Sequence, residues 1–379
     1  MSKFDALFVG AGLFNAVMAS EFVKAGKKVL VLERREHAGG NCSTYEDHGI
    51  IVHEHGAHIF HTNDGRIWEF ANRFGSFHPF INSPLAMVYD PAKSEYKGYN
   101  LPFNMNTFNQ IWGVVDPATA KDIIEKEAAR FKKERYDNLE EKALSLVGGR
   151  IYDMFIKGYT EKQWGRPCTE IPADIITRIP LRFKFDNNYF NDTWQGIPDD
   201  GYTRWIEAML EGCTVEYGVD YLKERGKYEG VADMTFYSGR IDDYFNRVHG
   251  ELPYRSLEFR TQVVHGTENV QGVAVTNWPS PNVDFTRRIE HRHFMSDSQQ
   301  KYGIEKDCTI VTTEYPAKMT EVSEAYYPVV NAESNAMYSK YIHMKPKDVE
   351  FTGRLGRFEY NDMDDTISKA LCESALYIR

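Results

Sequence analysis

The chain has 379 residues, of which 42% are hydrophobic and 26% are charged. These are ordinary proportions for a folded protein, so the composition excludes wholesale disorder, and the length allows two or three compact domains. The formal net charge of -10 argues against nucleic acid as the main partner, because binding a phosphate backbone requires a basic surface.

The cysteine and hydropathy patterns indicate the cellular compartment in which the protein is expected to work. The five cysteines are dispersed and form no CxxC pair, which is not the pattern of a disulfide framework and indicates a reducing, cytoplasmic setting. No run approaches the ~20 apolar residues of a transmembrane helix. Glycines and an asparagine interrupt the apolar run over residues 6–19, so we interpret it as a buried strand and helix instead of a signal peptide.

The first forty residues predict a strand, a helix and a second strand. Residues 4–9 form a short apolar run, residues 13–25 have the pattern of a helix, and residues 29–32 form a second apolar run. Because a helix that crosses between two neighbouring strands leaves them parallel, the segment is a βαβ unit.

Helical patterns return in the second hundred residues. Asp116 and Asn138 each have the side chain of a helix N-cap and precede apolar residues at helical spacing. The second of these helices is expected to end at Gly148, since paired glycines follow. A third pattern, over residues 151–159, places its apolar residues on one face.

Extended patterns dominate the rest of the chain. Aromatic and β-branched residues alternate with turn residues over 178–202 and 254–315, which predicts antiparallel sheet. Residues 349–352 predict a strand, and the apolar spacing after Gly356 predicts a closing helix. The nucleotide-binding unit is therefore expected to be assembled from separated pieces of chain.

The turn between the first strand and helix has the composition of a dinucleotide site. Gly10 permits a tight turn, and Gly12 lets the backbone approach a pyrophosphate at the helix N-terminus. Glu33 ends the second strand, where a carboxylate binds a ribose hydroxyl. Asn15 is a departure, because glycine or alanine is usual at the third position of this motif.

Residues that follow Glu33 favour FAD over NAD. Arg34 and the segment 39–41, which holds two glycines and Asn41, suggest a second close approach of backbone to the same cofactor. This arrangement is common in glutathione-reductase-like flavoproteins and unusual in simple dehydrogenases. No second GxGxxG follows, so NAD(P)H or another external reductant is expected to act without a dedicated fold.

Four histidines, at positions 53, 55, 58 and 61, crowd one short segment. Imidazole is a good ligand for zinc or iron, but the chain has no HExxH motif and no carboxylate–histidine set at metal spacing. We therefore expect no metal. Structural histidines and histidines that contact the flavin or substrate remain open as alternatives.

Many short motifs occur in a consistent order along nearly the whole chain. They are residues 56–62, 101–107, 157–165, Arg178, 186–190, 201–203, 254–257, 286–287, 326–328, 353–356 and 360–363. Through these motifs and their order, the chain resembles the bacterial-type UDP-galactopyranose mutases. The resemblance departs at Arg288, where the family more usually has isoleucine, and Arg288 is either a substitute contact or a solvent-facing neighbour.

The resemblance implies an isomerase that interconverts UDP-galactopyranose and UDP-galactofuranose by ring contraction. Reduced FAD acts there as a nucleophile through its N5 atom at the anomeric carbon, without net redox change. A homodimer and a role in cell wall or polysaccharide biosynthesis are implied with it. The alternatives are a flavin-dependent amine or sugar oxidoreductase of the same fold and an FAD-free binding protein of the GDP-dissociation-inhibitor type.

The resemblance also implies roles for individual residues. The catalytic residues are Arg178, Arg287 and His61. Substrate-binding residues are Asn82, Phe155, Tyr159, Trp164, Tyr189, Arg255, Tyr327, Tyr360 and Asp362. Cofactor-binding residues are Gly10, Gly12, Leu13, Phe14, Glu33, Arg34, Gly40, Asn41, His58, Ile59, Val219, Arg354, Asp362 and Met363. Paired arginines suit a diphosphate because guanidinium binds phosphate oxygens bidentately.

The expected fold is α/β: a glutathione-reductase-like Rossmann FAD-binding domain with an inserted helical domain and an antiparallel β-sheet domain. The discontinuous FAD-binding domain comprises residues 1–65, about 205–250 and 330–379. The helical domain, which carries a mobile loop, comprises about 105–170. The sheet domain comprises about 66–104, 171–204 and 251–329.

Overall fold

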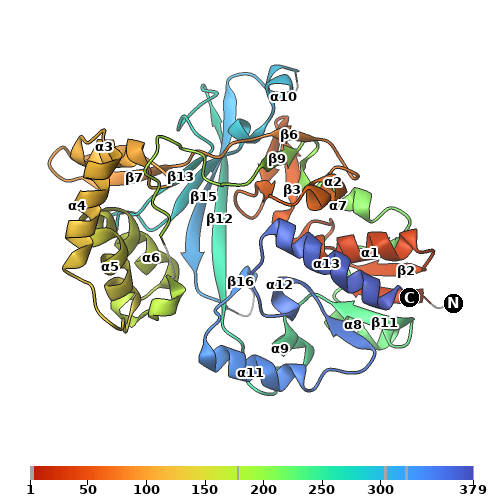
Figure 1. The fold of residues 1–379 in the computed structure, drawn as a ribbon. Helices are drawn as coiled ribbons and strands as arrows, with labels where there is room; N and C mark the ends of the chain where they lie inside the picture. Colours follow the sequence, from red (N-terminus) through yellow and green to blue (C-terminus); the bar gives the residue numbers. More distant parts are fainter. Residues whose placement is uncertain (1–3, 177–178, 303–304, 321–322, 379) are drawn as a thin grey trace.

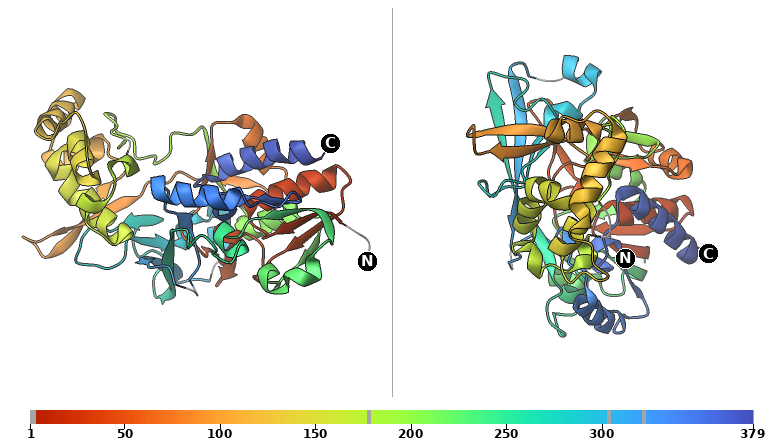
Figure 2. Two further views of the ribbon diagram at one scale, coloured as in Figure 1. Left: turned by 90° about the horizontal axis from the view of Figure 1, so that it is seen from below. Right: turned by 60° about the vertical axis from the view of Figure 1, so that its left-hand side comes forward.

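The computed structural model describes residues 4–176, 179–302, 305–320 and 323–378. Figure 1 shows a parallel sheet flanked by helices on the right, long antiparallel strands in the middle and a group of helices on the left. Seen from below, in the left view of Figure 2, that helical group lies at one end of an elongated molecule and the parallel sheet with its helices lies at the other.

The parallel sheet has five strands in the order β10-β2-β1-β11-β17. Their bounds are β1 Phe4–Val9, β2 Val29–Leu32, β10 Thr214–Glu216, β11 Ala232–Tyr237 and β17 Val349–Phe351. The sheet is therefore built from three distant parts of the chain. The predicted strand–helix–strand unit is confirmed, with helix α1 at Leu13–Lys24 between β1 and β2.

Helices cover both faces of this sheet, as a parallel sheet requires. On one face α1 packs with α7 (Gly201–Met209) and α13 (Met363–Tyr377) around Phe8 and Phe236. The other face is covered by α8 (Tyr221–Tyr228), α9 (Ile241–Tyr244) and α11 (Ala332–Ile342). The short α12 (Gly353–Gly356) follows β17 and faces the start of α1.

A seven-stranded sheet runs in the order β16-β12-β15-β14-β13-β7-β8. Its strands are β7 Leu85–Asp90, β8 Glu95–Asn100, β12 Tyr254–His265, β13 Val275–Asn277, β14 Arg287–Glu290, β15 Cys308–Ala317 and β16 Tyr327–Pro328. The predicted antiparallel sheet over 254–315 is confirmed, although β13 pairs with β7 in parallel. Helix α10 (Asp297–Tyr302) lies between β14 and β15 in the chain.

The strand prediction over 178–202 is wrong for most of its length. Within the described residues, only β9 (Trp194–Pro198) is a strand, and it forms a small sheet with β5 (Phe60–Thr62) and β6 (Phe77–Pro79). Residues 179–193 are irregular because their backbone groups bond to scattered partners, such as Tyr189 N to Asn82 O at 2.8 Å.

The remaining elements include β3 (Thr44–Asp47) paired with β4 (Ile50–His53), and α2 (Gly65–Ala71). The helical group comprises α3 Met105–Trp112, α4 Pro117–Ala129, α5 Leu139–Ile151, a π-helical turn Tyr152–Ile156 and α6 Lys157–Trp164. Asp116 and Asn138 cap α4 and α5 as predicted. However, α5 continues past Gly148, which makes a kink at φ +76°.

The fold class predicted from the sequence is confirmed: the structure joins a Rossmann-like parallel sheet, an antiparallel sheet and a helical group. None of the helices in the described part of the chain combines the length and apolar character needed to cross a membrane.

Candidate active site

The glycine turn leaves free space in front of the first helix. Gly10 has φ +98°, and a Cβ built on it would lie 2.2 Å from Ser238 Oγ. A Cβ on Gly12, by contrast, would meet nothing nearer than Gly40 Cα, at 4.0 Å. Glycine is therefore required at position 10 because any side chain would collide with Ser238. At position 12, by contrast, glycine leaves free space beside the N-terminus of α1, where backbone N–H groups attract phosphate.

A cavity of about 760 Å³ opens at this turn. All the cofactor-binding residues predicted from the sequence line it except Ile59, which is buried in the core, and Asp362, which is exposed at the N-cap of α13. Further lining residues that the sequence analysis missed include Cys42, Asp220, Ser238, Arg240 and Glu324. Of these five residues, only Ser238 could have been found from the sequence. It is a small residue directly after the apolar run of β11, and binding sites in such folds lie at the carboxyl ends of the strands.

Glu33 is 5% exposed, and backbone donors orient its carboxylate. One oxygen accepts from Ala11 N at 2.8 Å and the other from Arg35 N at 2.9 Å. Each oxygen keeps a further lone pair for a ribose hydroxyl. Arg34 lines the same cavity, but its guanidinium pairs with Glu324.

Asn15, the departure from the glycine motif, is 1% exposed and makes hydrogen bonds with both ends of its side chain. Its Nδ2 donates to Val9 O at 3.0 Å and to Gly10 O at 2.9 Å. Its Oδ1 accepts from Thr352 Oγ1 at 2.7 Å. The amide therefore fixes the carbonyls of the turn and joins it to the end of β17.

Arg287 lies at the centre of a second group of predicted residues. Its guanidinium lies 3.8 Å from Glu314 and donates to the Tyr159 hydroxyl at 3.3 Å. The charge of Glu314 is the main reason that the pKa of Arg287 is raised. Its Nε is buried and has no partner within the described residues, so the guanidinium keeps an unused donor.

Further predicted residues lie near Arg287. Burial raises the pKa of Tyr189, and the charge of Arg287 opposes this shift, so Tyr189 lies within electrostatic range of Arg287, as it does of Tyr159 and Tyr360. The Tyr327 hydroxyl accepts from Gln163 Nε2 at 3.2 Å. Arg255 donates to the Gln163 backbone oxygen. The structure thus brings the predicted catalytic Arg287 of β14 near predicted substrate-binding residues from α6, β12, β16 and the loop before α13.

Two residues connect this group to the cavity. Arg354 lines the cavity and places its guanidinium carbon 4.5 Å over the ring of Tyr360. His58 also lines the cavity; burial, with smaller contributions from the charges of Arg354 and Arg287, lowers its pKa to about 4. The arginine–tyrosine group and the cavity are therefore neighbouring parts of one site.

Other predicted residues take different positions. Asn82 is 7% exposed, and its Oδ1 is buried without a partner in the described chain. Phe155 packs against Tyr99 and Phe103 in the helical core, and Trp164 is partly buried against the same core. Arg178 lies outside the described residues.

His61 is held by two neighbours. Its Nδ1 lies 2.9 Å from Asp192 Oδ2, and its ring stacks on Phe190 with centroids 3.8 Å apart. Both partners come from the irregular segment before β9. The segment that the sequence analysis misread as strand thus orients a predicted catalytic side chain.

Comparison with known proteins identifies the family of this chain. A family model described as UDP-galactopyranose mutase matches residues 154–360, and one described as an NAD(P)-binding Rossmann-like domain matches residues 9–74. A probable UDP-galactopyranose mutase of Klebsiella pneumoniae is 35% identical over 379 residues, covering 98% of this chain and 94% of the relative. The chain belongs to the UDP-galactopyranose mutase family.

Two further similarities bear on function and fold. A dTDP-fucopyranose mutase of Escherichia coli is 32% identical, covering 98% of both chains. A crystal structure of a reduced UDP-galactopyranose mutase matches with a TM-score of 0.69 at 14% identity, covering 97% of this chain and 94% of that one, which shows the shared fold. The family resemblance inferred from the motifs and the prediction of a mutase are both confirmed.

Arg288, where this chain departs from the family pattern, lies on the opposite face of β14 from Arg287. Successive side chains of a strand point to opposite faces. Arg287 and Arg288 pair with Glu314 and Thr313 of β15, so the register does not shift between them. Since Arg287 faces Tyr159, Arg288 does not reach that hydroxyl from its own face, and it is not a substitute contact.

The fold keeps two buried imidazoles neutral, one from the histidine cluster and one from the turn after β14. His53 and His291 are 1% and 0% exposed. The Nδ1 of each accepts a backbone N–H: His58 N donates to His53, and His53 N donates to His291. Burial lowers the pKa of His291 to about 3 and that of His53 well below its usual value. Within the described residues, no group of histidine, cysteine and carboxylate side chains is placed to hold a metal ion.

This neutrality predicts a loss of stability in acid. The pKa of His291 is lower in the folded chain than the ordinary 6.5, so its contribution is complete above pH 6.5 and is lost as pH falls toward 3. Lowering the pH from 6.5 to about 4 is expected to remove about 3 kcal/mol through His291 alone, at 1.36 kcal/mol per pH unit. His291→Gln should flatten that part of the pH dependence in urea unfolding, and the exposed His343→Gln should not. Equal pH profiles for the wild type and His291→Gln would refute the assignment.

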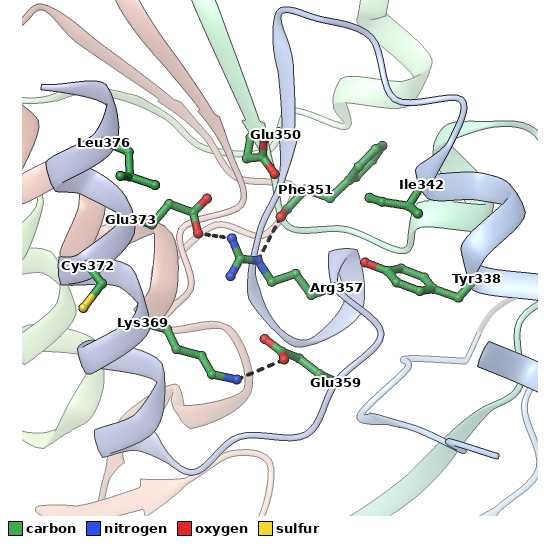
Figure 3. A pocket seen from close by; sticks show the side chains of 10 residues that line it. All are labelled: Tyr338, Ile342, Glu350, Phe351, Arg357, Glu359, Lys369, Cys372, Glu373 and Leu376. Carbon is green, nitrogen blue, oxygen red and sulfur yellow. Dashed lines mark hydrogen bonds and ion pairs between the residues drawn. The ribbon is translucent and has the colours of Figure 1, made fainter. Parts of the chain in front are cut away.

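A second cavity, of about 780 Å³, borders α11, β17 and α13 (Figure 3). Arg357 crosses it, donating from Nε to Phe351 O at 3.0 Å and pairing with Glu373 of α13. Its guanidinium carbon also lies 4.9 Å over the ring of Phe14. These contacts fix the turn that carries Arg354 against α1 and α13, so we assign this cavity a structural role.

Proposed function

We propose that the protein interconverts UDP-galactopyranose and UDP-galactofuranose with reduced FAD as its cofactor and no net redox change. The observation that carries the proposal is the junction of the dinucleotide cavity with the arginine–tyrosine group through Arg354 and His58. Membership of the mutase family supports it, and so does the identity of 35% to the Klebsiella relative. Action in the cytoplasm as a homodimer, for polysaccharide biosynthesis, is part of the proposal.

The residues of the cavity fit FAD. Gly12 leaves room for a pyrophosphate, the first N–H groups of α1 face that space without a side-chain cap, and Glu33 offers a buried carboxylate to a ribose. The cavity volume of about 760 Å³ lies within the range of cofactor sites. When bound, reduced FAD supplies the nucleophile for the anomeric carbon.

The chain's own contribution is to bind the diphosphate and assist its departure. Arg287 is charged throughout the accessible pH range, and its unused Nε donor is available to a phosphate oxygen. The hydroxyl of Tyr159 lies 3.3 Å from this guanidinium and can donate to the same group, and Tyr189 lies within range of its charge. A guanidinium and phenols fixed in advance stabilise the charge that develops as the nucleoside diphosphate leaves.

The Escherichia coli relative raises a second candidate function. That protein is described as a dTDP-fucopyranose mutase and is 32% identical over 98% of both chains. The same reaction on dTDP-fucose would need a pocket that accepts thymine and a sugar without the 6-hydroxyl. The arginine–tyrosine group serves either diphosphate equally, so the base and sugar must be tested directly.

The test uses dithionite-reduced, flavin-loaded protein incubated separately with UDP-galactofuranose and dTDP-fucofuranose, with the products separated by chromatography. Conversion of the UDP sugar to its pyranose form, and none in oxidised protein, is the expected result. Conversion of the dTDP sugar alone would replace the first candidate with the second. Flavin reduction by the sugar without added reductant would contradict both, because it would show an oxidoreductase.

A further inference from the structure

Helix α6 brings the predicted substrate-binding residue Tyr159 and its neighbour Gln163 to the sheet, and Lys162 of the same helix contacts a loop of that sheet. Tyr159 of this helix meets Arg287, while Gln163 contacts both Arg255 and Tyr327. Helix α6 also packs against β15. Its position therefore decides whether these side chains meet.

Lys162 donates to backbone oxygens of the loop between β13 and β14. Its ammonium bonds to Trp278 O, to Ser280 O at 3.0 Å and to Phe285 O at 2.7 Å. These three carbonyls use all three of its N–H donors. Burial lowers its pKa to about 8, and Asp284 is the charged group that opposes this shift. The ammonium therefore remains mostly charged at neutral pH.

The loop that Lys162 holds leads directly into Arg287. Trp278 N donates to Thr286 O at 2.8 Å, which closes the base of the loop one residue before Arg287. On the helix, a Cβ added to Gly158 would lie 2.2 Å from Pro279 O, so the two backbones are in direct contact. Helix and loop thus meet at two points, on either side of Tyr159 in the sequence.

We propose that Lys162 is a positioning residue that fixes α6 to the loop 278–286 and thereby sets Tyr159 against Arg287 for nucleotide binding. Without its charge-assisted bonds, three partly buried carbonyls lose their donor and the helix is released from the loop. Lys162 does not touch the reacting sugar. This inference rests on the proposed function, because it assigns the nucleoside diphosphate as the ligand of that site.

The test measures UDP affinity by calorimetry and steady-state kinetics in the flavin-loaded full chain at neutral pH. Lys162→Met is expected to raise the Kd of UDP and the KM of the UDP sugar by about tenfold, with a smaller change in kcat. Lys162→Arg should recover most of the affinity, because a guanidinium can still donate to these carbonyls. Lys157→Met, at an exposed lysine of the same helix, is the matched control and should match the wild type.

A second variant disturbs the same contact between α6 and the loop 278–286 without changing Lys162. Gly158→Ala adds a methyl group that the loop backbone cannot accommodate, so it should displace α6 and raise the Kd in the same way. Amide hydrogen exchange over 157–165, measured without ligand, should quicken in Lys162→Met and Gly158→Ala only. Unchanged UDP affinity in both variants would overturn the inference alone, whereas absence of UDP binding to the wild type would overturn it together with the proposed function.

Discussion

Arg287→Ala is expected to lower kcat for sugar interconversion by about 10²–10³-fold, the usual cost of removing one fixed donor to a developing negative charge. The guanidinium keeps an unused buried Nε and shares the site with the Tyr159 hydroxyl, 3.3 Å away. Ground-state binding should weaken as well, since the same donor holds the diphosphate before reaction. The measurement is the initial rate of the reduced holoenzyme with saturating UDP-galactofuranose.

The neighbouring arginine provides the control. Arg288→Ala removes the same charge from the opposite face of β14 and should keep kcat within about twofold of the wild type. Because Arg287→Ala leaves the carboxylate of Glu314 without this partner, melting temperatures of both variants must accompany the rates. Arg287→Lys keeps the charge but loses the planar fork, so an intermediate rate is expected. A rate for Arg287→Ala within twofold of the wild type, in folded protein, would remove Arg287 from the diphosphate site.

Local features of this fold were predictable because their causes lie within a few residues. The strand–helix–strand unit follows from two apolar runs and a glycine turn, and the structure has β1, α1 and β2 within one residue of the predicted bounds. The caps of α4 and α5 follow from Asp116 and Asn138, whose side chains accept N–H groups three residues ahead. The motifs likewise identified the family before any contact was known.

Contacts between distant parts of the chain were not predictable from pattern. Asn15 looked like a flaw in the glycine motif, yet its amide bonds to Thr352, 337 positions away. The clash that makes Gly10 indispensable comes from Ser238. Residues 179–193 have the composition of strands, but their backbone groups bond to loops instead of a neighbouring strand, and that choice depends on tertiary packing.

Gly12→Val is expected to abolish flavin binding while leaving the fold intact. The backbone of Gly12 is extended, at φ -83° and ψ 170°, a conformation that valine favours. The added Cβ would meet nothing nearer than Gly40 Cα, at 4.0 Å, and the side chain would occupy the space where the pyrophosphate is expected to approach the helix. The flavin-to-protein absorbance ratio of the purified variant should fall by about tenfold or more, because the close backbone approach is blocked.

The choice of Gly12 separates loss of cofactor from loss of fold. Gly10→Ala would confuse the two, since its methyl would collide with Ser238 and its φ of +98° strains any other residue. Gly226→Ala, at a helical glycine with no atom within 4 Å of the added methyl, is the matched control and should purify with normal flavin content. If Gly12→Val protein has a normal circular dichroism spectrum and no yellow colour, the turn is the cofactor site. A fully loaded, yellow Gly12→Val protein would show that the pyrophosphate lies elsewhere, and the assignment of the whole cavity would then fail with it.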